Sequence, residues 1–169
     1  MGDVTQTYGT YTALTLTSIA SLASSATAGW RSDVIDNRTT KARDYEFLFT
    51  LPMANTAAAN HAAIYPFLVP AMHNGSAWQY SDGGTATLPT AGPGTYTFGG
   101  ITTTNNFVQM PALAYTAADQ VVQGVRFASQ ASGWAMWDGF LVFILNYSGS
   151  AFDASGQVIA YKAIGDNVA

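Results

Sequence analysis

The sequence predicts an all-β protein: an antiparallel β-sandwich that is jelly-roll-like and contains little helix. Apolar and polar residues alternate with a period of two in several segments, which is the pattern of strands that bury one face. Pairs of turn-forming residues, such as Asn74-Gly75 and Ser155-Gly156, separate these segments. Many short strands joined by such turns are typical of sandwiches and barrels.

The alternating pattern is clearest in four segments, and each is predicted to be a strand. In chain order they are 11–19, 43–51, 120–127 and 157–164. The second of them puts its aromatic side chains on one side and its acidic side chains on the other, as in a half-buried strand. In the third, Val121, Val125 and Phe127 face one way. In the fourth, Ile159 and Tyr161 are expected to lie in the core.

Two further segments are continuously apolar. Residues 140–145 are β-branched or large and apolar and are bounded by Gly139 and Asn146, which predicts a strand covered on both faces. Residues 64–69 are similar, but Pro66 has no N–H to donate to a neighbouring strand. We therefore expect that strand at a sheet edge or at a bulge.

The remaining elements are short. Brief strands are expected at 77–80, 95–101 and 107–113. Asn74-Gly75 lies between apolar flanks and predicts a β-hairpin. The alanine-rich segment 54–63 and the segment 21–28 are compatible with one or two helical turns each.

The domain organisation follows from length and composition. A chain of 169 residues can bury one substantial core. Residues 1–10 are polar and are predicted to form an N-terminal arm, and residues 11–169 a single β-sandwich domain. The longest strongly apolar run, 140–145, is too short to span a bilayer, so a membrane is not an expected partner.

The low charge content is the main compositional signal. Only 9% of the residues are charged, against about 25% in an average soluble domain. Such a chain has few charges to keep it apart from its neighbours, which indicates that much of its surface faces other protein. The segment 85–118 has no charged residue and is the predicted partner-facing surface. Of the six basic residues only Arg38, Lys41 and Arg43 are close in sequence, among acids, so nucleic acid is not expected as a partner.

The sequence contains no recognisable catalytic set, and we predict no enzyme and no cofactor. There is no cysteine, no G-x-S-x-G motif, no P-loop and no dinucleotide fingerprint. His61 and His73 are the only histidines, and both are interpreted as surface or turn residues. Asp33 and Asp36 are weak candidates for a metal site, but a turn that closes a strand explains them better. A hydrolase that uses carboxylates such as Asp36 and Glu46 is the least favoured alternative.

Exposed aromatic side chains are the predicted partner-binding residues. Each tryptophan lies next to Gly, Ala or Asp or within the short aromatic-rich segment 134–137, rather than in a long apolar run. The candidates are Trp30, Trp78, Trp134 and Trp137, together with Tyr8 in the N-terminal arm. Aromatic side chains on sandwich loops can anchor a protein interface or stack on sugars. The structural alternative is that the tryptophans cap the open ends of the sandwich.

Both ends of the chain resemble small structural proteins of tailed bacteriophages. The similarity lies in Ser21-Leu22-Ala23-Ser24, in Gly29-Trp30-Arg31-Ser32-Asp33-Val34-Ile35-Asp36-Asn37, in the acidic-aromatic segment 44–51, and in the closing segments 140–149 and 157–164. The resemblance implies a jelly-roll or related sandwich that coats a capsid as a cement or decoration protein, or that belongs to the tail. It carries no catalytic residues.

The sequence therefore predicts a non-enzymatic virion structural protein, made in the host cytoplasm and located on the capsid surface. As a decoration protein it would bridge neighbouring subunits of the major capsid protein and associate with its own copies, with a homotrimer expected. The alternative is a phage tail or baseplate module that binds surface glycan through Trp78 and the segment 134–137.

Overall fold

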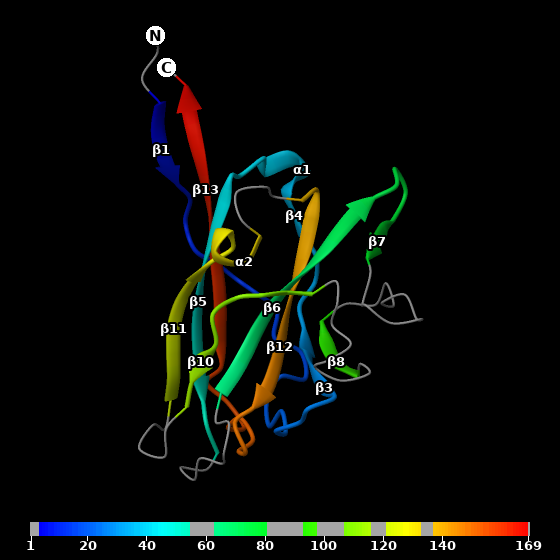
Figure 1. Ribbon diagram of the computed structural model, residues 1–169, viewed down its shortest axis with the longest axis vertical. Coiled ribbons are helices and arrows are strands. Elements are labelled where there is room, and N and C mark those ends of the chain that lie inside the picture. Colours follow the sequence, from blue (N-terminus) through cyan, green and yellow to red (C-terminus); the bar gives the residue numbers. More distant parts are fainter. Residues whose placement is uncertain are drawn as a thin grey trace.

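The computed structural model describes residues 4–54, 63–80, 93–97, 107–115, 121–132 and 137–168. Within these residues the strands form two antiparallel sheets that enclose a hydrophobic core (Figure 1). The predicted all-β, sandwich-like fold is thereby confirmed, and it is compatible with a jelly roll.

The smaller sheet has five strands in the described part of the chain. Its order is β1 (Val4–Tyr8), β13 (Val158–Val168), β5 (Asp44–Pro52) and β11 (Val121–Phe127), and β2 (Thr12–Ala13) also pairs with β13. The alternation predicted for β5 is confirmed, because Tyr45, Phe47, Phe49 and Leu51 are buried and the intervening residues after Asp44 are partly exposed. The predicted strand at 157–164 is confirmed and extends further, to Val168.

The larger sheet has eight strands among the described residues. Its order is β10 (Leu113–Ala114), β6 (Ala63–His73), β12 (Gly139–Tyr147), β3 (Ala28–Arg31) and β8 (Gly94–Thr97). Three short strands lie off this path: β4 (Ile35–Asp36) pairs with β12, and β7 (Trp78–Tyr80) and β9 (Val108–Gln109) pair with β6. Two four-residue helices, α1 (Asn37–Thr40) and α2 (Ser129–Ser132), occur among the described residues.

Strand β12 is buried on both faces, as its sequence predicts. Its inner side chains, such as Phe140, join the core between the sheets, where the Tyr45 and Phe140 ring centres are 5.0 Å apart. Its outer side chains form a second cluster with Phe67, against which Phe107 and Tyr96 pack. A strand with apolar layers on both sides needs no polar face, which explains the continuous apolar run.

The expectation that Pro66 places its strand at an edge or bulge is wrong. Strand β6 lies inside the sheet and pairs with β12 along nine residue pairs, Pro66 opposite Ile144. The carbonyl of Pro66 accepts a hydrogen bond from the Met110 N–H, on the side of β6 away from β12. In an antiparallel strand the nitrogen and the carbonyl of one residue point to the same side, so the nitrogen of Pro66 also faces away from β12. On that side the neighbouring strands are short and separate, and Pro66 falls between β10 and β9, where a ladder donor is not needed.

The predicted strand at 11–19 is also wrong beyond its first residues. Only Thr12 and Ala13 form a strand, and the Leu14 N–H adds one bond to the carbonyl of Ile159. Ser18 and Ser21 then adopt left-handed backbone angles, with φ of 62° and 56°, and turn the chain. Segment 21–28 forms no helix, and the alanine-rich segment lies, from 55 to 62, outside the described residues.

The hairpin predicted at Asn74-Gly75 is confirmed between β6 and β7. The Asn74 side-chain oxygen accepts hydrogen bonds from the N–H groups of Ser76 and Ala77, and Gly75 has a φ of 97°. Gly75 therefore occupies a conformation that residues with a side chain rarely adopt.

The chain ends lie side by side and extend the smaller sheet (Figure 1). Residues 4–8, predicted to be part of a separate arm, are strand β1 and pair with the end of β13. Residues 165–168 of β13 continue past the last residue that pairs with β5, which is Ile164. We call β1 and residues 165–168 the terminal ribbon.

Candidate functional site

The assignment of Trp30 to a partner-binding loop is wrong. Trp30 lies on β3, its side chain is 0% exposed, and its indole N–H donates to the carbonyl of Thr17 at 2.9 Å. Trp30 pairs with Ile144 and faces the core between the sheets. The neighbouring glycine and arginine made this position look like a loop. In the structure the indole ring packs in the core and its N–H has a hydrogen-bond partner.

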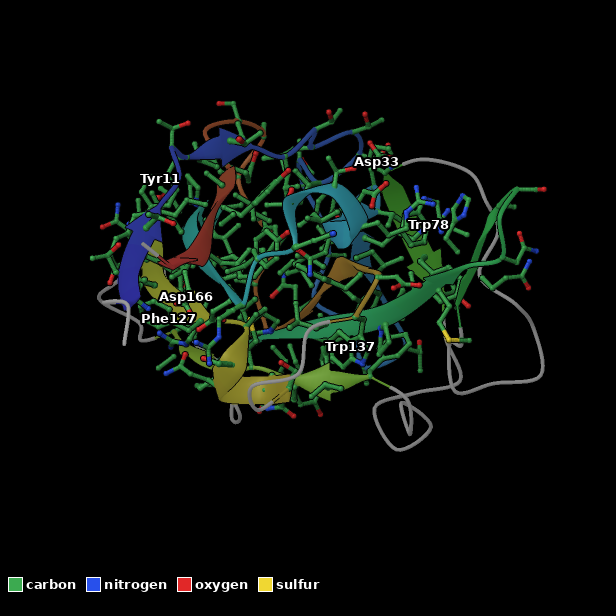
Figure 2. The ribbon with its side chains drawn as sticks, turned by 90° about the horizontal axis from the view of Figure 1, so that it is seen from above. Tyr11, Asp33, Trp78, Phe127, Trp137 and Asp166 are labelled. Carbon is green, nitrogen blue, oxygen red and sulfur yellow. The ribbon has the colours of Figure 1, made fainter. Side chains whose placement is uncertain are left out.

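Two of the other predicted contact residues, Trp78 and Tyr8, lie in different parts of the described structure. Trp78 is half-buried on β7, with the Arg38 guanidinium carbon 4.8 Å from its ring centre and the His73 ring against it. Tyr8 is 59% exposed on the terminal ribbon, and Trp134 is outside the described residues. Figure 2 shows Trp78 on one side of the molecule and Tyr11, near Tyr8 in sequence, on the opposite side.

Asp36 acts as a helix cap. One of its carboxylate oxygens accepts from the backbone N–H of Arg38 at 2.9 Å, which caps α1, and the Arg38 guanidinium binds both oxygens. The hydrogen bond from the Arg38 side chain lowers the pKa of Asp36. Asp33 is exposed, and the described residues contain no cluster of three or more potential His, Asp or Glu metal ligands. The turn interpretation of Asp36 is thus the one that the geometry supports.

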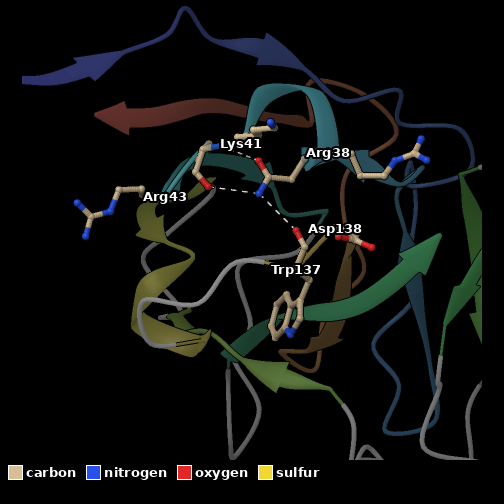
Figure 3. A pocket seen from close by; sticks show the side chains of 7 residues that line it. Arg38, Lys41, Arg43, Trp137 and Asp138 are labelled. Carbon is tan, nitrogen blue, oxygen red and sulfur yellow. Dashed lines mark hydrogen bonds between the residues drawn. The ribbon is translucent and has the colours of Figure 1, made fainter. Parts of the chain in front are cut away.

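A polar pocket of about 450 Å³ lies beside α1. It is lined by Asn37, Arg38, Lys41, Ala42, Arg43, Trp137 and Asp138 (Figure 3). The Asn37 side chain is buried here. Its oxygen accepts from the Ala42 N–H at 2.8 Å and from the Tyr45 hydroxyl at 2.7 Å, and its NH₂ group donates to the carbonyls of Ala42 and Trp137. Every polar atom of this amide has a partner, so Asn37 holds the pocket together and is not available to a ligand.

The basic side chains of the pocket do not converge on a common point. Figure 3 shows Arg38 and Arg43 pointing away from each other. Arg38 binds Asp36, and Arg43 binds Asp166 at the terminal ribbon. An anion site needs donors aimed at one place, so the arrangement is a polar depression with one aromatic wall, Trp137. Sequence reasoning did not predict this structural role of Asn37, because an asparagine after a helix-capping aspartate is also common in ordinary turns.

The outer face of the five-stranded sheet carries several exposed apolar side chains beside the polar residues Gln123, Thr50, Glu46 and Lys162. We call this surface the outer face and define it by Val121, Val125 and Phe127 of β11, Leu48 and Pro52 of β5, and Val158 of β13. The β11 residues share a side, as predicted, and Val122 faces the core instead. Val121, Val125 and Val158 are each more than 40% exposed. The solvent side of an antiparallel sheet is normally polar, so these exposed valines make the surface a candidate for an interaction site.

The charges on this surface compensate each other. The Lys162 ammonium lies 3.1 Å from the Glu46 carboxylate, and the Tyr11 hydroxyl donates to the same carboxylate. Burial would raise the pKa of Glu46, but the hydrogen bonds from Tyr11 and Lys162 and the lysine charge outweigh it and lower that pKa. Lys162 also lies over the rings of Tyr8 and Tyr11, 5.4 and 4.8 Å from their centres. Glu46 and Lys162 therefore compensate each other at the Phe127 end of this surface.

The uncharged segment 85–118 is partly buried and partly exposed where the structure describes it. Phe107, Met110, Leu113 and Tyr115 are all buried, and Tyr96 packs on Phe143. These apolar residues are neutral because they pack inside the chain. Thr95, Thr97, Gln109, Pro111 and Ala114 are exposed, so the prediction that this segment faces a partner stays a prediction.

The fold and these surfaces define a class: an antiparallel β-sandwich with a sheet face that carries exposed apolar side chains and a projecting ribbon at the chain termini. None of the helices in the described part of the chain is long and apolar enough to cross a membrane. No family model, curated protein or solved structure matches the chain.

Proposed function

We propose that this protein is a non-enzymatic structural component of a virion, a capsid decoration or cement protein that docks through the outer face. The observation that carries the proposal is the set of exposed valines on a sheet surface where the charged pair in the described part of the chain, Glu46 and Lys162, neutralises itself. The partner suited to such a surface is a neutral, apolar region of protein, because burial of apolar area is the main driving force of association. The resemblance of the chain ends to phage structural proteins implies a place on the capsid or in the tail, and the major capsid protein is the partner that fits the first of these.

The proposed mechanism is mechanical. Two sheets joined by a continuous aromatic core make a stiff body, which can transmit force between the subunits that it contacts. Arg126 also connects the sheets, because its guanidinium donates to the carbonyls of Pro111 and Ala112 at 2.7 Å each. On a capsid the same contact repeats at every equivalent position, so modest individual affinities add up by multivalency.

Replacing Val125 with aspartate is expected to weaken capsid binding by at least about tenfold, because docking would bury an unpaired carboxylate. Val125 is 43% exposed on an outer strand, so the fold should tolerate the change. The measurement is co-sedimentation of the purified protein with shells of the major capsid protein from the same virus. Met72→Asp is the matched control, since Met72 is even more exposed but lies on β6, away from the outer face. Equal binding by both variants, or no binding by the wild type, would contradict the proposal.

The polar pocket favours a second candidate function, glycan binding by a tail or baseplate module. Its lining combines the Trp137 ring with the polar and charged side chains of Asp138 and Lys41, which is the chemistry of many sugar sites.

If glycan binding is the function, Trp137→Ala should weaken saturable binding on a glycan array by about tenfold, since it removes the aromatic wall. Met72→Asp should leave it unchanged. Absence of saturable binding by the wild-type protein would reject this candidate.

A further inference from the structure

The terminal ribbon has an open edge. Strand β1 pairs with β13 on one side, Thr5 opposite Asn167 and Thr7 opposite Gly165. No other strand in the described part of the chain pairs with the outer side of β1. Figure 1 shows β1 and the end of β13 projecting together from the body of the molecule.

The hydrogen-bond pattern identifies which backbone groups are exposed on that edge. The Gly9 N–H donates to the carbonyl of Ala163 at 2.9 Å, in the same register as the ribbon. Bonded and non-bonded pairs alternate in an antiparallel ladder, so Thr7 and Thr5 also direct their N–H and C=O groups toward β13. The N–H and C=O groups of Val4, Gln6 and Tyr8 therefore point outward, where they can bond to another strand.

The sequence of β1 does not protect this edge. Natural edge strands are usually blocked by charged side chains, proline, a bulge or a covering element. Strand β1 reads Val-Thr-Gln-Thr-Tyr, which has no charge and no proline and favours extended structure. The Tyr8 hydroxyl also donates a 2.8 Å hydrogen bond to the side-chain carbonyl oxygen of Gln6. The edge is thus neutral, and β1 pairs with β13 in an unbroken register over its whole length.

We propose that β1 pairs with β1 of a second copy of this chain, antiparallel and centred on Gln6. The proposal rests on the assembly role proposed above and specifies how copies of the protein contact one another. A second copy is the favoured occupant because one two-fold contact covers the open edge of both chains at once, and because a neutral strand places no like charges opposite each other.

The pairing has a definite register. Gln6 lies opposite Gln6 of the partner subunit, Val4 opposite the partner's Tyr8, and Thr5 opposite the partner's Thr7. Because the outward groups belong to Val4, Gln6 and Tyr8, the contact forms about six backbone hydrogen bonds. The two smaller sheets then become one continuous sheet across the dimer. This dimer differs from the homotrimer that the sequence predicts.

A proline at position 6 tests the pairing. Gln6→Pro removes the N–H that points to the partner and leaves the Thr5 and Thr7 groups that bond to β13, so the ribbon should keep its structure. Gln6→Ala is the matched control, since it loses the same side chain and keeps the N–H. In sedimentation velocity, we expect dimers for the wild type and Gln6→Ala, and association weaker by at least about tenfold for Gln6→Pro. Unchanged melting temperatures would show that both variants are folded.

A cross-linking experiment tests the register. The chain has no cysteine, so introduced cysteines are unique. Thr5 and the partner's Thr7 form a non-bonded pair with Cα atoms about 4.5 Å apart, within disulfide range. Thr5→Cys and Thr7→Cys chains should therefore cross-link when they are mixed, and much less when either is oxidised alone. Equal cross-linking of a single variant, a monomeric or trimeric wild type, or a dimer unaffected by Gln6→Pro would each overturn the proposal.

Capsid co-sedimentation separates this inference from the proposed function. A wild-type chain that binds capsid shells but remains monomeric overturns the strand pairing and leaves the docking role intact. A chain that dimerises as described but binds no capsid shell supports the pairing and contradicts the docking role.

Discussion

Replacing Trp30 with alanine is expected to lower the free energy of unfolding by about 3–5 kcal/mol, the usual cost of removing a large aromatic side chain from a core. The indole is completely buried on β3 and contributes to the main core cluster. Its removal also leaves the carbonyl of Thr17 without the 2.9 Å bond from the indole N–H. Urea unfolding followed by circular dichroism measures the change.

Trp78→Ala is the matched control for this prediction. Trp78 is only half-buried and contacts Arg38 and His73 near the surface, so its loss should cost about 1–2 kcal/mol. If Trp30→Ala instead left the unfolding free energy unchanged and altered only partner binding, the buried position of Trp30 would be refuted, and the original assignment as a contact residue would be restored.

Replacing Asn37 with alanine is expected to cost about 3 kcal/mol, because the buried partners of its amide would lose their hydrogen bonds. These partners are the N–H and C=O of Ala42, the carbonyl of Trp137 and the hydroxyl of Tyr45. The same bonds join α1 to β5 and to the start of β12, so the pocket should lose its shape as well as its stability. Thermal unfolding and the near-ultraviolet circular dichroism of Trp137 would report the two effects.

Asn74→Ala provides a control of the same chemistry in another setting. The Asn74 oxygen also accepts two backbone N–H bonds, but in an exposed hairpin turn where water can replace it. Its replacement should cost about 1 kcal/mol or less. Equal losses for Asn37→Ala and Asn74→Ala would mean that burial does not strengthen the Asn37 network.

Much of the architecture could be predicted from local patterns. The alternation around Phe47, the continuous apolar run of β12 and the Asn74-Gly75 turn each identified an element correctly, because period and turn chemistry are properties of adjacent residues. The prediction of a strand at 11–19 was wrong, although its alternation is regular. The left-handed backbone angles of Ser18 and Ser21 turn the chain there. The prediction from Pro66 was wrong for another reason. Pro66 lies in an internal strand, because a gap between the two short neighbouring strands β10 and β9 accommodates it.

The candidate surfaces depended on contacts between distant parts of the chain. Alternation shows that Val121 and Val125 share a side, but only the pairing of β11 with β5 shows that this side faces solvent. Likewise, Trp30 has the same local sequence whether it is a loop anchor or a core residue, and the neighbouring strand β12 decides which.

The sequence by itself determined the low charge content, the absence of cysteine and the short alternating strand segments. These properties depend only on the identity of each residue and of its neighbours in the chain. The neutral outer face and the open edge of β1 arise only in the folded molecule. Whether a residue is exposed depends on which segments pack over it. In this fold those segments are strands that lie far away in the sequence.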